Sequence, residues 1–231
     1  MQKLLGTWLP PNAAAHGGEI DRLITLMHWL MALLFVGWCI YFIVVLFRFR
    51  SGRTAQASYA GAKGSFSTYV EAGVVVVEVI LLVGFAIPAW ARWVTPPEAE
   101  EDPLRVRVEG EHFGWNVHYR GPDGVFGRSP IELVDSTNPI GLDRSDPFAA
   151  DDVTTINQLH LPVDRAVSIE LSSKDVIHSF YLPQMRVKQD AIPGMAIPVH
   201  FKPVRMTPEE ARLPACAASK SCWEIACAQL C

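Results

Sequence analysis

Two long apolar runs dominate the first 94 positions of the chain. The first extends from Leu23 to Phe47, 25 positions with no acidic or basic side chain except His28. The second extends from about Tyr69 to Val94 and includes two acids, Glu71 and Glu78. A helix needs about 20 apolar residues to span a bilayer. The pattern therefore predicts two transmembrane helices.

The period of the pattern changes after residue 103. Residues 104–109 and 167–171 alternate apolar and polar positions, which is typical of half-buried strands. Gly-Pro-Asp-Gly at 121–124 is a strong turn signal. We therefore expect a two-helix membrane anchor within residues 1–94, a Pro- and acid-rich linker at 95–103, and an all-β sandwich at 104–231.

Charge orients this arrangement. The connection at 48–68 carries four basic residues and no acid, which places it on the cytoplasmic side and both termini outside. Residues 95–231 carry 13 Lys and Arg against 20 Asp and Glu, a net charge of −7. An acidic external domain argues against a nucleic-acid partner. No signal peptide is recognisable at the start, so the first span is expected to direct export.

Three residues supply soft metal ligands. Cys227 and Cys231 form a Cys-x-x-x-Cys pair, and His178 lies upstream in Lys-Asp-Val-Ile-His-Ser-Phe. Thiolates and imidazole together favour copper or zinc over hard cations. The spacing lets two sulfurs reach one site and bridge two metal ions, which suits one-electron transfer. Taken alone, the cysteine pair is equally compatible with zinc or a disulfide, and a lone histidine is usually structural.

A third segment lies between these two, Val-Lys-Gln-Asp-Ala-Ile-Pro-Gly-Met at 187–195. In this order the three segments resemble subunit II of the haem-copper cytochrome c oxidases. The resemblance implies a cupredoxin-like sandwich that carries a dinuclear copper centre, CuA. Its ligands would be His178, Cys227, Cys231 and the backbone carbonyl of Gln229. The family pattern continues past the second cysteine with Gly-x-x-His and Met, also ligands, whereas this sequence ends at Cys231.

The same resemblance implies a function. The chain would be an electron-transfer subunit in a bacterial cytoplasmic membrane. It would accept electrons from a c-type cytochrome and pass them to subunit I, which reduces oxygen. Haem is not expected in this chain, which lacks Cys-x-x-Cys-His and a set of membrane histidines. A copper-free quinol-oxidase subunit and a non-catalytic scaffold subunit are the alternatives, and the retained histidine and cysteines favour copper.

Two departures from the family pattern affect particular roles. The family has a Gln-Trp-x-Trp segment, whose first tryptophan admits electrons from cytochrome c. Here Phe113 replaces that first tryptophan, and Trp115 stands at the second. Core packing is the alternative for Trp115. Gln229 replaces a glutamate whose carboxylate helps to bind magnesium at the subunit I interface. Hard cations prefer anionic oxygen ligands, which an amide does not supply. The sequence therefore does not decide whether magnesium binds here.

The acids of the second span have possible roles in proton transfer. Glu71 and Glu78 are seven residues apart and so share a helix face, and ionisable groups within spans suggest function. Glu71 matches the position of a family glutamate that helps to load protons. An acid at the lipid headgroups is the alternative for Glu71, and a structural partner on another subunit is the alternative for Glu78. His28 is expected to bond between helices.

Other residues carry weaker expectations. Cys216 and Cys222 are predicted to form a disulfide, since the domain is exported, and Cys39 is expected to be a small buried apolar residue. Asp175 and Asp190 are expected to support the metal ligands or an interface. Pro88 is expected to bend the outer end of the second span.

Overall fold

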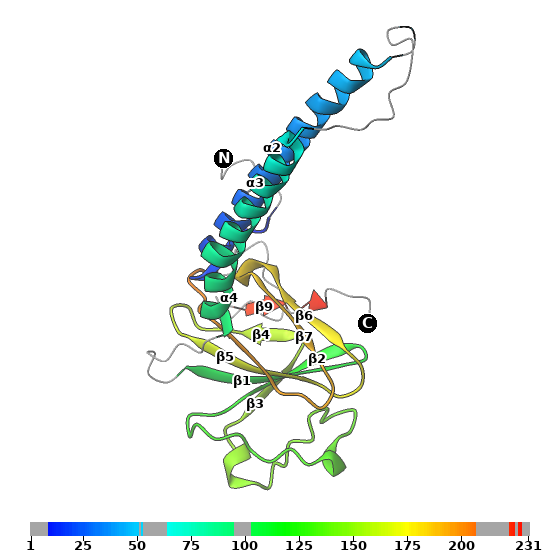
Figure 1. Ribbon diagram of the computed structural model, residues 1–231. Coiled ribbons are helices and arrows are strands. Elements are labelled where there is room, and N and C mark those ends of the chain that lie inside the picture. Colours follow the sequence, from blue (N-terminus) through cyan, green and yellow to red (C-terminus); the bar gives the residue numbers. More distant parts are fainter. Residues whose placement is uncertain are drawn as a thin grey trace. The chain divides into compact units, whose positions relative to one another are not determined.

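A computed structural model describes residues 9–50, 52, 64–94, 103–206, 222–224 and 226–227. The chain divides into two compact units. One unit, Glu19–Arg92, is helical, and the other combines Met1–Gly18 with Trp93–Cys231 and contains the strands. The predicted fold class, two membrane-length helices and an all-β domain, is confirmed (Figure 1).

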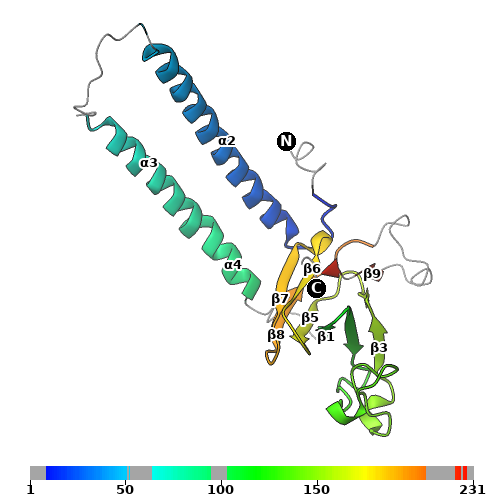
Figure 2. The same cartoon turned by 90° about the vertical axis from the view of Figure 1, so that its right-hand side faces the viewer.

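The helical unit contains two long helical segments, seen as separate rods in Figure 2. Helix α2 is Gly17–Arg48, and the second segment comprises α3 (Phe66–Leu81), a π-helical turn η1 (Leu82–Ala86) and α4 (Ile87–Val94). At the end of η1 the N–H of Ile87 donates to the carbonyl of Leu82, five residues back. Pro88 follows at once and has no N–H to donate, so the irregular turn lies where the α-helical ladder loses a donor.

Both segments are long and apolar enough to cross a membrane. Their most apolar 18-residue windows are 0% buried within the chain. A helix that is apolar on all sides is stable in lipid or against other membrane helices. The structure therefore agrees with the predicted spans.

In the described part of the second unit, ten strands form three sheets. Strand order is β3-β2-β1-β5-β8 in the large sheet, β10-β6-β7 in the second and β4-β9 in the smallest. The bounds are β1 Leu104–Glu111, β2 Gly114–Tyr119, β3 Val153–Ile156, β4 Gln158–His160, β5 Val167–Ser173, β6 His178–Leu182, β7 Val187–Ala191, β8 Ile197–Phe201, β9 Cys222–Glu224 and β10 Ala226–Cys227. All neighbours pair antiparallel except β1 and β5, which are parallel.

The core lies between the large sheet and the β6–β7 layer. The predicted strands at 104–109 and 167–171 are confirmed as β1 and β5, and Val108 pairs with Leu171 at their centre. Both side chains are 0% exposed, as the alternating pattern requires. Trp115 from β2 and Phe180 from β6 meet edge to face, with ring centroids 5.5 Å apart. Such aromatic contacts join the two layers.

Residues 10–16, the N-terminal strap, belong to the β-domain. The Ala13 N–H donates to the Gln184 carbonyl at 2.8 Å, and the Val204 N–H donates to the Ala13 carbonyl at 2.7 Å. Ala13 and Ala14 are 3% and 1% exposed and lie in the core cluster. The sequence division placed this segment with the anchor, whereas its contacts are with the β-domain.

Residues 120–152, the distal loop, connect β2 to β3 and lie at the lower end of the β-domain in Figure 1. The predicted turn is present, with the Gly124 N–H bonded to the Gly121 carbonyl at 3.1 Å. Buried Asp152 closes the loop by accepting from the backbone N–H groups of Gly121 and Gly127 and from Nε2 of His118, at 3.0, 2.8 and 2.7 Å.

Candidate metal centre

His178 is the first residue of β6 and is 1% exposed. Its ring lies over Gly110 of β1, where an added Cβ would come within 2.9 Å of the imidazole Cδ2. A glycine at this position therefore makes room for the ring. Trp115 contacts the same ring edge to face, at a centroid distance of 5.8 Å. Sheet packing thus holds the imidazole in an almost dry environment.

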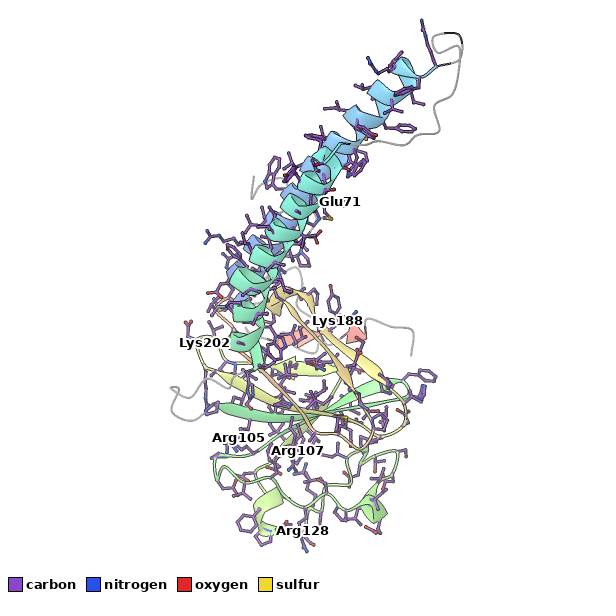
Figure 3. The ribbon with its side chains drawn as sticks, in the orientation of Figure 1. Glu71, Arg105, Arg107, Arg128, Lys188 and Lys202 are labelled. Carbon is purple, nitrogen blue, oxygen red and sulfur yellow. The ribbon has the colours of Figure 1, made fainter. Side chains whose placement is uncertain are left out.

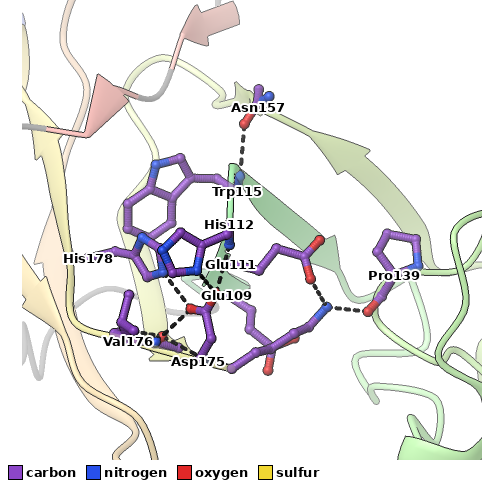
Figure 4. Close-up of polar contacts among 11 residues, drawn as sticks. Glu109, Glu111, His112, Trp115, Pro139, Asn157, Asp175, Val176 and His178 are labelled. Carbon is purple, nitrogen blue, oxygen red and sulfur yellow. Dashed lines mark hydrogen bonds and ion pairs between the residues drawn. The ribbon is translucent and has the colours of Figure 1, made fainter. Parts of the chain in front are cut away.

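Asp175 orients the His178 ring (Figure 4). Its Oδ1 accepts from His178 Nε2 and from the Val176 N–H, both at 2.7 Å. Its Oδ2 accepts from the backbone N–H of His112 at 2.9 Å and from His112 Nδ1 at 2.5 Å. A carboxylate only accepts, so both rings direct an N–H at it. Four donors thus determine the orientation of one side chain.

Burial raises the pKa of Asp175, but the hydrogen bonds from His178, Val176 and His112 outweigh it and hold the pKa well below its ordinary range. The carboxylate is therefore charged throughout the neutral range. An anionic acceptor makes the stronger hydrogen bonds to the two imidazoles.

An ion-pair cluster borders this group. Lys174 Nζ lies 2.7 Å from Glu111 Oε2 and 3.6 Å from Glu109 Oε2, and it also donates to the Pro139 carbonyl of the distal loop. Burial raises the pKa of Glu109 despite Lys174. Burial also favours a higher pKa for Glu111, but the hydrogen bonds from Lys174 and Asn116 and the charge of Lys174 together outweigh it, and the pKa is lowered. Lys174 thus joins β1, the β5–β6 loop and the distal loop beside Asp175.

The cysteine segment approaches the same strand. Cys227 ends β10 and pairs with Phe180, two residues along β6 from His178. Cys222 begins β9 and pairs with His160 of β4. Only the backbone of these two cysteines is described, and Cys216, Gln229 and Cys231 lie outside the described residues. Among the described residues no group of three His, Cys, Asp or Glu side chains could hold a metal ion.

The chemistry of the candidate ligands suits a copper ion. An imidazole whose Nε2–H donates a hydrogen bond to a carboxylate presents Nδ1 as the nitrogen with a lone pair, which is the usual arrangement behind a metal-bound histidine. Backbone pairing brings Cys227 to the strand of that histidine. Nitrogen with thiolate sulfur is a donor set that copper accepts.

The other predicted residues fall into separate places. Phe113 is 80% exposed in the β1–β2 turn, and Trp115 is 4% exposed in the core. Glu71 and Glu78 are both exposed on α3, where Figure 3 labels Glu71. Asp190 pairs with Ser179 across β6 and β7.

Two residues of the anchor can be compared with expectation. Nδ1 of His28 forms a bond within α2, to the Ile24 carbonyl at 2.8 Å. The expected bond from His28 to another helix stays a prediction. Cys39 is half-buried rather than buried.

Sequence reasoning missed His112, Gly110 and Asn157. Asn157 has φ 58° and exchanges hydrogen bonds with the backbone of Trp115, both at 2.8 Å. The sequence offered one clue to Asn157: asparagine tolerates the left-handed region, and this one lies between two short strands. His112 stood next to Phe113 in the aromatic segment, but nothing local linked it to a loop 63 residues away.

The chain is similar to known proteins over almost its whole length. The family model "Cytochrome C oxidase subunit II, periplasmic domain" matches residues 143–206. The "Alternative cytochrome c oxidase subunit 2" of Bradyrhizobium diazoefficiens is 30% identical over 230 residues, which cover 99% of this chain and 76% of that protein.

Two further similarities are weaker. A "Probable quinol oxidase subunit 2" of Staphylococcus saprophyticus is 26% identical over 161 residues, covering 68% of this chain and 34% of that protein. A solved structure, the periplasmic domain of subunit II of cytochrome oxidase (CoxB) of Bradyrhizobium japonicum, is 26% identical. It has a TM-score of 0.30 and covers 47% of this chain and 69% of that chain.

Proposed function

Because the chain belongs to the cytochrome c oxidase subunit II family, we propose that it is the electron-input subunit of a haem-copper terminal oxidase. It accepts single electrons from a c-type cytochrome at a dinuclear copper centre and passes them to subunit I. The observation that carries this proposal is the buried His178, oriented by Asp175 on the strand that pairs with Cys227.

Each part of the chain has a task in this proposal. His178, Cys227, Cys231 and the backbone carbonyl of Gln229 hold the copper, which supplies one-electron chemistry when bound. Trp115, which packs against Phe180, covers the His178 ring and excludes water from it. The two apolar helices anchor the domain in a bacterial cytoplasmic membrane, with the β-domain on the periplasmic side. Oxygen is reduced in subunit I.

A copper-free quinol oxidase is the second candidate, because one relative carries that name. A quinol enters from the bilayer and needs no exported metal centre. The retention of both cysteines and of the buried His178 favours the copper-containing alternative.

The identity of the electron donor distinguishes a cytochrome c oxidase from a quinol oxidase. Membranes that contain the assembled oxidase should oxidise a reduced c-type cytochrome and should lose at least 90% of this rate in the Cys227→Ser variant. Assembly of the variant is checked by the haem absorbance of the purified complex. Quinol oxidation that persists in the variant, without cytochrome oxidation by wild type, would overturn the proposal.

A further inference from the structure

Asp175 is shared by two histidines that come from different parts of the β-domain. His178 is almost completely buried at the start of β6, whereas the His112 side chain is 38% exposed in the β1–β2 turn. Their rings meet edge to face with centroids 5.5 Å apart. One carboxylate thus links a surface imidazole to the buried one (Figure 4).

The loop that carries Asp175 has little packing of its own. Residues 175–177 are exposed. The solvent-exposed fractions of Val176 and Ile177 are 44% and 54%. Within this loop the Val176 N–H is the local donor to the carboxylate. Ser173 at the end of β5 holds the backbone of the loop, because its Oγ accepts from the Asp175 N–H at 3.4 Å and donates to the Val176 carbonyl. The contacts that tie the Oδ2 atom of the Asp175 carboxylate come from His112, through its backbone N–H and through Nδ1.

The hydrogen bond from the His112 ring constrains the Asp175 carboxylate more than the bond from the His112 backbone N–H does alone. Two donors from His112 converge on Oδ2, while His178 and Val176 occupy Oδ1. Because each carboxylate oxygen has its own pair of donors, the plane of the Asp175 carboxylate is fixed and Oδ1 stays directed at His178 Nε2. With the ring absent, the side chain of Asp175 can rotate about its terminal bond, since that torsion is broad for a carboxylate.

We infer that His112 is a positioning residue for the metal centre. Its ring holds Asp175 in the orientation that receives the Nε2 proton of His178, and so it makes Nδ1 of His178 the metal-binding nitrogen. The inference rests on the proposed function, because the consequence of the orientation is copper ligation. Hydrogen bonds behind a ligating histidine commonly change metal affinity or activity by 10- to 100-fold.

The first test needs no copper. Full-length protein with isotope-labelled histidine is studied by nuclear magnetic resonance in detergent, without metal. His178 should be the Nε2–H tautomer with a slowly exchanging proton. His112→Leu should speed that exchange at least tenfold, and Asp175→Ala should give a mixture of tautomers. His112→Asn should restore slow exchange, because an asparagine amide can donate from about the position of Nδ1.

The matched control is His200→Leu. His200 pairs with Ser168 near the start of β5, whereas the Asp175 loop follows the end of that strand. The two places are about 15 Å apart along the strand. This variant should leave the His178 exchange rate unchanged.

The second test uses the copper-loaded protein. His112→Leu should shift the reduction potential and the paramagnetic resonance spectrum of the centre, and lower copper affinity about tenfold. His112→Asn should return all three toward wild type. Wild-type His178 exchange and wild-type copper spectra in His112→Leu would overturn the inference. A wild-type protein that binds no copper but shows the tautomer effect would overturn the proposed function alone.

Discussion

His118 is a buried histidine outside the metal centre, and it makes the stability of the β-domain depend on pH. Burial lowers its pKa, the bond to Asp152 opposes this shift, and Arg107 and Arg144 add to the lowering. The folded state therefore takes up a proton less readily than the unfolded state. Stability is complete above the ordinary histidine pKa of about 6.5 and falls as the pH drops below it.

Replacing this histidine should flatten that dependence. In His118→Gln the unfolding free energy should fall less than in wild type between roughly pH 7.5 and pH 5.5. Urea unfolding of both proteins measures the two slopes. His160 and His200, whose pKa values are also lowered by burial, remain in both proteins and cancel in the difference. Equal slopes would show that His118 is not the titrating group.

Asp152 should be the larger contributor to stability. Asp152→Ala leaves His118 and the N–H groups of Gly121 and Gly127 without their acceptor. We expect a loss of about 3 kcal/mol, as is typical for buried donors deprived of a charged partner. Neighbouring Asp151, which is less buried, is the control, and Asp151→Ala should cost under about 1 kcal/mol. Similar losses for both variants would contradict this assignment.

Glu71 carries a separate prediction about protons. Glu71→Gln keeps the shape of the side chain but cannot accept and release a proton, so oxygen consumption by the assembled oxidase should slow severalfold. Glu78→Gln, on the same helix, is the comparison. Measuring the rate from neutral to alkaline pH tests this. A wild-type rate across that range would make Glu71 an acid at the lipid headgroups.

At the scale of elements, the N-terminal strap completes the core of a domain that begins about 90 residues later. Ala14→Asp places a charge at a position that is 1% exposed. We expect the β-domain to lose roughly 2 kcal/mol or more, since a buried polar group without partners is costly. Limited proteolysis should then cut the β-domain faster in the variant. Ala15→Asp, at an exposed position of the same segment, should have little effect.

Local patterns predicted the elements with a clear period. The spans, β1, β5 and the turn at 121–124 each follow from hydrophobic periodicity or turn chemistry within a few residues. The N-terminal strap and the π-helical turn could not be predicted in this way. Residues 10–16 carry no alternation of their own and pair with backbone near Gln184 and Val204, contacts that only the tertiary fold creates. Pro88 predicted an irregularity but not its form.

The candidate metal centre likewise combines residues that the sequence predicted with residues that only the tertiary fold brings together. His178 and Cys227 were identified from their chemistry, and the pairing of β6 with β10 brings their strands together. Asp175 was expected to support the site because it lies three residues from His178. His112 and Gly110 depend on the position of β1 against β6, which no sequence spacing records.

At the scale of the whole molecule, charge should govern the encounter with the electron donor. The segment 95–231 has a net charge of −7, which attracts a basic cytochrome and raises the association rate. Salt screens this attraction over a Debye length of about 10 Å at moderate ionic strength. Stopped-flow oxidation of the cytochrome should therefore slow as salt rises, and exposed Phe113→Ala should slow it further without changing the copper spectrum. A rate that is flat or rises with salt would exclude electrostatic steering.

Copper content is the most direct test of the central claim. Full-length protein should contain two copper ions per chain and show a paramagnetic resonance spectrum in which one unpaired electron is shared by both nuclei. Cys227→Ser and Cys231→Ser should each abolish that spectrum, because each removes a thiolate of the proposed bridge. Full-length protein without copper, or a cysteine variant that keeps both ions and an unchanged spectrum, would contradict the account.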